Sequence, residues 1–346
     1  MKPRNIDDWI QKKQKRRQDS TPDFLFKGIQ SGDKTALSAG ITLIESQLPE
    51  HRILANALIQ KCLPLSGNSI RVGITGVPGV GKSTFIEHFG GLFSEQDGGV
   101  AVLAVDPSSA VSRGSILGDK TRMNELAINP NVFIRPSPAG DTLGGVARKT
   151  RESIILCEAA GYKTILIETV GVGQSEVMVK SMVDFFLLLM LSGAGDELQG
   201  IKKGIMEMAD ALVITKADGD NVKKSKLAAR EYKNALHLFP PNPNEWIPRV
   251  FTCSALKGEN MEEALETIQS FENHVKLNGS FNRNRREQDR RWLKETLKEL
   301  ILSGFFANST LMERLEQNEQ RVMDGEISSF QAAEELYKAY QGGRRV

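Results

Sequence analysis

The sequence predicts an α/β protein with a doubly wound, mostly parallel sheet, flanked by N-terminal helices and by a C-terminal helical arm. Short runs rich in Val, Ile and Leu alternate with helical patterns through the middle of the chain. That alternation is typical of βαβ units. A glycine-rich turn joins the first apolar run to a helical pattern, which is the second observation that favours this fold class.

Six apolar runs are strand candidates, and most of them end in a polar residue. They lie at 70–75, 100–106, 164–169, 185–191, 211–218 and 249–255. Helical patterns such as "VARKTRESIILCEAAGY" and "VKKSKLAAREYKNALHLF" separate most of them. The run "FFLLLML" is too short to cross a bilayer, so it is interpreted as a buried parallel strand.

Helical patterns without strands occupy both ends of the chain. Residues 5–63 show apolar side chains at helical intervals. Beyond about 275 an amphipathic pattern places Leu293, Leu297, Leu300 and Ile301 on one stripe, and two more helices follow. Three such helices have little core of their own, so we expect them to pack on the main domain or on a second subunit. The predicted regions are an N-terminal helical region at 1–66, a nucleotide-binding domain at 67–275 and a dimerisation arm at 276–346.

Composition favours an ordinary globular protein. Of 346 residues, 40% are hydrophobic, and 45 basic residues nearly balance 43 acidic ones, so charge gives no reason to expect nucleic acid. The three cysteines and four histidines are scattered, without the spacing of a metal site or a disulfide framework. The first residues lack the apolar core of a targeting segment. We therefore expect a cytoplasmic protein with no membrane partner.

The stretch "GITGVPGVGKSTFIEHFG" matches the P-loop pattern GxxxxGK[ST], and a predicted strand precedes it while a predicted helix follows. Its glycines allow consecutive N–H groups to point at phosphate oxygens. Lys82 is predicted to bridge the β- and γ-phosphates and to act in catalysis, and Ser83 is predicted to bind Mg²⁺. The chain is thus predicted to be a P-loop NTPase. The predicted phosphate-binding residues are Gly76, Val77, Pro78, Gly79, Val80, Gly81, Lys82, Ser83 and Thr84.

Two acids end predicted strands. Asp106 closes "VAVLAVD" and Glu168 closes "TILIE". The carboxyl ends of parallel strands face the ligand crevice, and Mg²⁺ prefers oxygen ligands. Both acids are therefore candidate metal ligands, and Asp119 in "GSILGDKTRM" is a weaker candidate on spacing alone.

The pattern Glu168-x-x-Gly171 resembles the DxxG switch of G proteins, with Glu in place of Asp. Gly171 is predicted to let a backbone N–H approach the γ-phosphate. The next residue is Val172, where Ras-like proteins carry the glutamine that positions the attacking water, and the nearest glutamine is Gln174. We therefore predict slow hydrolysis without a partner.

Two elements predict that the base is guanine. Lys216 and Asp218 in "VITKAD" match [NT]KxD, and an Asp carboxylate can accept hydrogen bonds from both N1–H and the exocyclic amine of guanine. Thr215 stands where Asn is commoner, which predicts reduced affinity. A second element, "TCSALKG", matches the loop whose backbone N–H meets guanine O6, and it contributes Ser254, Ala255 and Leu256. Together they predict GTP and GDP as ligands.

Several longer strings resemble one family. "VAVDPSS", "GSILGDKTRM", "FIRPSPAGDTLGG", "ETVGVGQSE" and "GDELQGIKKGIME" look like the methylmalonyl-CoA mutase-associated GTPases, the MeaB/ArgK class of P-loop chaperones. The likeness covers nearly the whole chain.

The resemblance implies a GTPase that guards an adenosylcobalamin-dependent acyl-CoA mutase of the methylmalonyl-CoA mutase type. Such proteins gate cofactor loading, protect or reactivate the mutase, and usually form homodimers through the C-terminal arm. The family's active-site acids correspond to Asp106, Asp119 and Glu168, so the resemblance implies catalytic roles for Asp119 and Glu168. The loop 193–204 matches a mobile switch in which Lys202 contributes to catalysis.

Two other functions share parts of this pattern. A nickel metallochaperone GTPase has the same P-loop class, but it would need clustered His and Cys ligands. A kinase is the second alternative, because an older label ties the family to arginine transport through ATP-dependent phosphorylation. Asp218 argues against ATP, and measuring whether the purified protein prefers GTP or ATP distinguishes a GTPase from a kinase.

Overall fold

The computed structural model describes residues 21–96, 98–105, 123–136, 143–169, 175–193 and 203–342. The chain divides into two compact units, Met1–Gln288 and Asp289–Val346. The described part of the first unit contains a seven-stranded parallel sheet in the order β3-β2-β4-β1-β5-β6-β7. The strands are β1 (Ile70–Gly76), β2 (Val100–Val105), β3 (Val132–Arg135), β4 (Thr164–Thr169), β5 (Phe185–Met190), β6 (Ala211–Ile214) and β7 (Arg249–Thr252).

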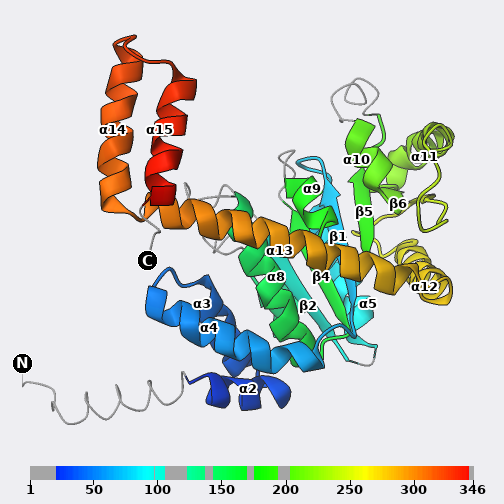
Figure 1. Cartoon of the computed structure of the whole chain (residues 1–346). Coiled ribbons are helices and arrows are strands. Elements are labelled where there is room, and N and C mark those ends of the chain that lie inside the picture. The colour runs from blue at the N-terminus through cyan, green and yellow to red at the C-terminus, as the bar shows by residue number, and fades with distance from the viewer. Residues whose placement is uncertain are drawn as a thin grey trace, which may run out of the picture. The chain divides into compact units, whose positions relative to one another are not determined.

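Helices cover both faces of the sheet (Figure 1). Right-handed crossovers place the helices that lead toward β3 on one face and those that lead toward β7 on the other. The first face carries α5 (Lys82–Ser94), α7 (Asn124–Ile128) and, after β7, α12 (Met261–Leu277). The second face carries α8 (Leu143–Ala159), α9 (Ser175–Lys180), α10 (Lys203–Met208) and α11 (Val222–Leu236).

The N-terminal helices pack against the α8 layer as a further layer of helices. They are α2 (Pro22–Gln30), α3 (Lys34–Glu45) and α4 (Pro49–Cys62), and the short 3-10 helix η1 (Leu63–Leu65) leads from α4 toward β1. Thr21 and Asp33 cap α2 and α3 by accepting hydrogen bonds from backbone N–H groups of the first turn. The predicted N-terminal helices are confirmed from Pro22 onward, and residues 1–20 lie outside the described residues.

All six predicted strands exist, but those predicted at 211–218 and 249–255 end earlier, at Ile214 and Thr252, and β3 was not predicted. This strand has four residues at the edge of the sheet, and only Val132 and Phe133 are buried. Four residues are too few to show the alternation of buried and exposed side chains that predicts a strand. This segment is a strand because its backbone pairs with β2.

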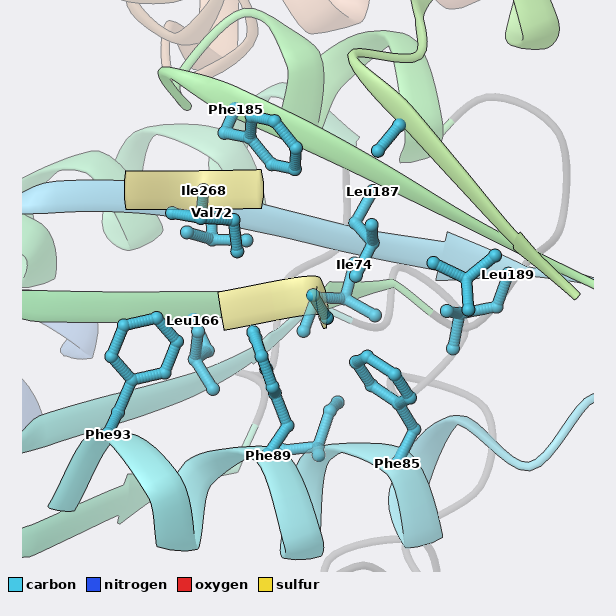
Figure 2. Packing of buried hydrophobic residues seen from close by; sticks show 14 of the residues in the cluster. Val72, Ile74, Phe85, Phe89, Phe93, Leu166, Phe185, Leu187, Leu189 and Ile268 are labelled. Carbon is cyan, nitrogen blue, oxygen red and sulfur yellow. The ribbon is translucent and has the colours of Figure 1, made fainter. Parts of the chain in front are cut away.

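The core between α5 and the sheet is built from three phenylalanines (Figure 2). Phe85, Phe89 and Phe93 are four residues apart, so they lie on one face of α5 and point at the strands. The ring centroids of Phe85 and Phe89 are 5.1 Å apart, and those of Phe89 and Phe93 are 4.9 Å apart. They pack with alternate side chains of β1, including Val72 and Ile74. This packing fixes the start of α5 beside the end of β1.

Buried ion pairs join several elements at the amino-terminal edge of the sheet. Arg71 of β1 pairs with Glu158 of α8 at 3.0 Å, and Arg285 of α13 (Ser280–Phe306) pairs with Asp184 just before β5 at 2.5 Å and with Glu158 at 3.4 Å. Burial alone would raise the pKa of Glu158, but the charges of Arg71 and Arg285 outweigh it and hold that pKa below its usual 4.5. Gln288 adds a hydrogen bond from its side chain to the Val183 carbonyl at 2.7 Å. These contacts fasten residues 280–288 to the sheet.

The second unit consists of three helical segments. They are the part of α13 after Gln288, α14 (Ser309–Met323) and α15 (Ser329–Gly342). Leu311, Ala332 and Leu336 are buried, and the Tyr340 hydroxyl donates to the Ile301 carbonyl at 3.3 Å. The predicted helical arm is thus confirmed as helical. No helix in the described residues has both the length and the apolar character needed to cross a bilayer.

We expect Arg285→Ala to lower the free energy of unfolding by about 3–5 kcal/mol, because Asp184 and Glu158 would then be buried with one cation fewer. Urea unfolding at neutral pH measures this loss. Arg286→Ala removes an exposed arginine from the same helix and is the matched control, with an expected change within about 0.5 kcal/mol. Equal stabilities of the two variants would contradict the assignment.

The pH dependence gives a second measure of the same network. Because the folded-state pKa of Glu158 is lowered, its contribution to stability is present above its usual pKa of 4.5 and is lost as the pH falls through the folded-state value. The difference in stability between the native protein and Glu158→Gln should therefore shrink as the pH is lowered below about 4.5.

Candidate nucleotide-binding site

The predicted phosphate-binding residues form one strand–loop–helix unit. β1 ends at Gly76 and α5 begins at Lys82. A Cβ at Gly76 would lie 2.5 Å from the Leu189 carbonyl oxygen of β5, so this position has no room for a side chain. Gly81 has φ +91°, in the left-handed region that glycine adopts without strain. The buried Val80 side chain anchors the loop in the core.

Lys82 is held within the loop. Its Nζ donates to the Gly76 carbonyl at 2.7 Å. Burial lowers the pKa of Lys82 below its usual 10.5, while the carboxylates of Glu168 and Glu176 oppose that shift. The lysine that is predicted to bind the β- and γ-phosphates therefore has carboxylates within electrostatic reach.

The end of β4 places Glu168 beside the loop. In the sheet register Glu168 pairs with Ile74 of β1 on one side and with Ala104 of β2 on the other. The next residue, Thr169, donates its hydroxyl to that of Thr75 at 2.7 Å, and both threonines are buried. This hydrogen bond fixes the end of β4 to the strand that carries the loop.

Thr215, which follows β6, connects the predicted base motif to the phosphate loop. Its side chain is buried, and its hydroxyl donates to the Val80 carbonyl at 2.7 Å. In the sequence, Thr215 stands where Asn is commoner, which predicts reduced affinity. The structure shows that the hydroxyl supplies a hydrogen bond to the loop, and reduced affinity stays a prediction.

Lys216 and Asp218 lie at the same edge of the sheet. Lys216 has φ +55°, which costs a residue other than glycine roughly 1–2 kcal/mol. Its Cε lies 3.9 Å from the position that a Cβ would take at Gly81, so the side chain extends along the loop. The Asp218 carboxylate accepts a hydrogen bond from the Ser254 hydroxyl at 2.5 Å.

The loop after β7 is tied to this segment a second time. The Ala217 N–H donates to the Cys253 carbonyl at 3.0 Å. Ser254 is buried, Ala255 packs against the core, and Leu256 is exposed. The two elements predicted to read guanine are therefore adjacent, with a carboxylate fixed in place that can accept from guanine N–H groups.

Several predicted site residues lie outside the described residues. They are Asp106, Asp119, Gly171 and Lys202, together with Val172 and Gln174. Within the described residues, no group of three or more His, Cys, Asp or Glu side chains could hold a metal ion. Ser83 and Glu168 are the predicted metal ligands that the structure describes, and the complete magnesium site stays a prediction.

Two side chains around the base motif were not predicted from the sequence. Asn221 donates to the Lys216 carbonyl at 2.8 Å, and Ser192 donates to Asn221 Oδ1 at 2.7 Å. Their only signal in the sequence was proximity, because Asn221 follows "TKAD" by three residues and Ser192 follows the predicted strand "FFLLLML". Glu176, almost fully buried near Lys82, was also missed.

Comparisons with known proteins agree with this geometry. A family model described as methylmalonyl Co-A mutase-associated GTPase MeaB matches residues 37–310. A probable GTPase of Mycobacterium tuberculosis is 49% identical over 92% of this chain and 95% of its own length. A mitochondrial methylmalonic aciduria type A homolog of Mus musculus is 44% identical over 92% of this chain and 79% of its own. The crystal structure of a LAO/AO transport system kinase superposes with a TM-score of 0.73 at 37% identity, covering 92% and 97% of the two chains.

We expect Thr215→Val to weaken GDP binding by about 5–30-fold. The substitution keeps the shape of the side chain but leaves the buried Val80 carbonyl without its hydroxyl donor, a loss of about 1–2 kcal/mol. Asp218→Asn should weaken GDP binding more severely, because the amide presents a donor to the guanine N–H groups.

Calorimetry with GDP and ADP measures both effects. Thr42→Val is the matched control, since its exposed hydroxyl also donates to a backbone carbonyl, that of Ser38, away from this edge of the sheet. ATP or ADP binding as tight as that of the guanine nucleotides in the native protein would show that the guanine assignment is wrong.

Proposed function

The chain belongs to the methylmalonyl-CoA mutase-associated GTPase family, and on that premise we propose that it is a GTP-hydrolysing chaperone of an adenosylcobalamin-dependent acyl-CoA mutase. In this function the nucleotide state gates the loading of the cofactor into the mutase and protects or reactivates that enzyme. The observation that carries the proposal is that Thr215 donates a hydrogen bond to the phosphate loop, while Asp218, three residues later, presents a carboxylate suited to guanine that Ser254 holds in place. The mutase as partner rests on the description of the matching family.

The nucleotide would lie along the edge where the strands end. The loop from Gly76 to Thr84 would hold the phosphates, and Lys82 would leave the Gly76 carbonyl to bind the β- and γ-phosphates. Lys216 would lie along the base, and Asp218 would accept from its N–H groups. GTP and GDP are the ligands that this arrangement fits.

Residues at this edge also suit a magnesium ion. The Ser83 hydroxyl in the first turn of α5 and the Glu168 carboxylate at the end of β4 are the oxygen donors that Mg²⁺ prefers. We propose that Asp106 and Asp119 complete the set with the phosphates. A bound Mg²⁺ would neutralise charge that develops on the phosphates during hydrolysis.

Hydrolysis is proposed to depend on the partner. Val172 stands where a water-positioning glutamine would be expected, so a standard catalytic part is missing from that position. The predicted switch 193–204, whose last two residues begin α10, carries Lys202 and is the proposed coupling element. A mutase that positions this charge would accelerate hydrolysis.

We further propose that the C-terminal arm, predicted at 276–346, joins two copies of the chain. Four side chains of α13 that the sequence analysis placed on one stripe are exposed: Leu293, Leu297, Leu300 and Ile301. Leu293 is 71% exposed and Leu297 is 54% exposed. Exposed apolar side chains at these helical intervals support an interface on this face of α13.

The three buried, unpaired cysteines support a reducing compartment, and we propose the cytoplasm.

The partner-dependent mechanism predicts slow intrinsic GTP hydrolysis and a large stimulation by the cognate mutase. Charge supplied or positioned by a partner is typically worth about 10³–10⁵ in rate. Lys202→Ala should lose most of the stimulation but keep its affinity for GDP, because the proposed base and phosphate contacts lie elsewhere. GTP turnover with and without the mutase measures both.

Lys203→Ala is the matched control for that assay, because it removes the neighbouring lysine and should keep the stimulation. If Lys202→Ala and the native protein were stimulated equally, the loop would not be the coupling element. If the mutase stimulated neither, the proposed partner would be wrong.

For the arm, we expect light scattering of the native protein to give twice the chain mass of 38.2 kDa. Leu293→Glu with Leu297→Glu should give a monomer, because two carboxylates would then have to be buried in the interface. Leu227→Glu changes an exposed leucine on α11 and should leave the dimer intact. A monomeric native protein would refute the proposal.

A further inference from the structure

The base-binding segment, residues 215–218, has an unfavourable backbone that something must hold in place. Lys216 is in the left-handed region at φ +55°. For a residue other than glycine, this conformation persists only where the surroundings fix it. The contacts of Lys216 therefore indicate which residues set the geometry of base recognition.

Asn221 holds this segment at two points. Its side-chain Nδ2 donates to the Lys216 carbonyl at 2.8 Å, and its backbone N–H donates to the Asp218 carbonyl at 3.0 Å. The second bond belongs to the 3-10 helix η3 (Gly219–Asn221) that leads into α11. The two bonds together close the turn that carries both predicted base contacts.

Ser192 fixes the orientation of the Asn221 amide. Its hydroxyl donates to Asn221 Oδ1 at 2.7 Å, so the Asn221 oxygen faces Ser192 and the Asn221 nitrogen faces Lys216. An asparagine side chain offers both a donor and an acceptor, which this arrangement needs. Ser192 follows β5 by two residues and comes directly before the predicted switch 193–204, so the residue that precedes this switch is hydrogen-bonded to Asn221.

We infer that Asn221 is a positioning residue for guanine recognition, and that Ser192 acts through Asn221 to connect the base-binding segment to the loop after β5. The inference deepens the proposed function and rests on its guanine site. Asn221 itself does not contact the base in this assignment. It holds the Lys216 carbonyl, and through it the direction in which the Lys216 side chain and the Asp218 carboxylate point.

The test compares the affinities of the full-length protein for GDP and ADP. Both nucleotides carry the same phosphates and ribose, so their affinity ratio reports on the base alone. Asn221→Ala should lower the preference for GDP over ADP by about tenfold, the equivalent of one hydrogen bond to the segment, with ADP binding unchanged. Asn221→Asp should lose as much, because a carboxylate cannot donate to the Lys216 carbonyl.

Asn278→Ala is the matched control. The Asn278 side chain also donates to a backbone carbonyl, that of Asn244, at 2.9 Å, but far from the base-binding segment in sequence. It should keep the native preference for GDP. A purely structural role of Asn221 would lower the melting temperature without changing the GDP-to-ADP ratio, and that result would overturn the inference.

Ser192 is tested by a double-mutant cycle. Ser192→Ala should lower the preference for GDP less than Asn221→Ala does, and Ser192→Thr should restore it because the hydroxyl is kept. The double variant should be no worse than Asn221→Ala alone, since Ser192 acts through Asn221. Independent, additive losses would overturn the assignment of Ser192.

The outcomes also separate this inference from the proposed function. If the native protein does not prefer GDP to ADP, the guanine site and the inference both fail. If the native protein prefers GDP and Asn221→Ala shows the same preference, the guanine site stands and the inference alone fails.

Discussion

The parallel direction of all the strands described is the constraint on which the candidate site depends. Parallel strands end at one edge of the sheet, so residues far apart in the sequence meet there. The phosphate loop follows β1, Glu168 lies near the end of β4, Thr215 follows β6 and Ser254 follows β7. Side-chain hydrogen bonds then join these ends in pairs, as between Thr215 and the Val80 carbonyl. Strand direction brings the groups together, and the hydrogen bonds set their positions.

Much of this arrangement could be predicted from the sequence because its signals are local. A P-loop is one continuous pattern between a strand and a helix, and "TKAD" is a four-residue pattern at a strand end. The phenylalanines of α5 follow the helical period. Such features need no knowledge of what lies opposite them in the fold.

The features that the sequence did not predict depend on contacts between distant segments. β3 is too short to show a period and exists because β2 lies beside it. The role inferred for Asn221 depends on its hydrogen bonds to the Lys216 carbonyl and to the Ser192 hydroxyl, which the sequence does not show. Arg285 belongs to the basic run "NRNRREQDRR" at 282–291, a pattern typical of a solvated helix face, yet it lies between Asp184 and Glu158. In each case the role of the residue or strand depends on which distant segment it contacts, and a local sequence pattern does not specify that segment.

The strand β5 has one further consequence. Asp184, just before it, binds Arg285 at the amino-terminal edge, and Ser192, just beyond it, binds Asn221 at the opposite edge. All six residues of β5 are buried, and close-packed interiors compress little. At about 3.3 Å per residue, the six residues of β5 span roughly 20 Å between the first turns of α13 and the base-binding segment. Residues 280–288 and the base-binding segment are therefore fastened to opposite ends of one buried strand, which also pairs through Leu189 with Gly76 at the start of the phosphate loop.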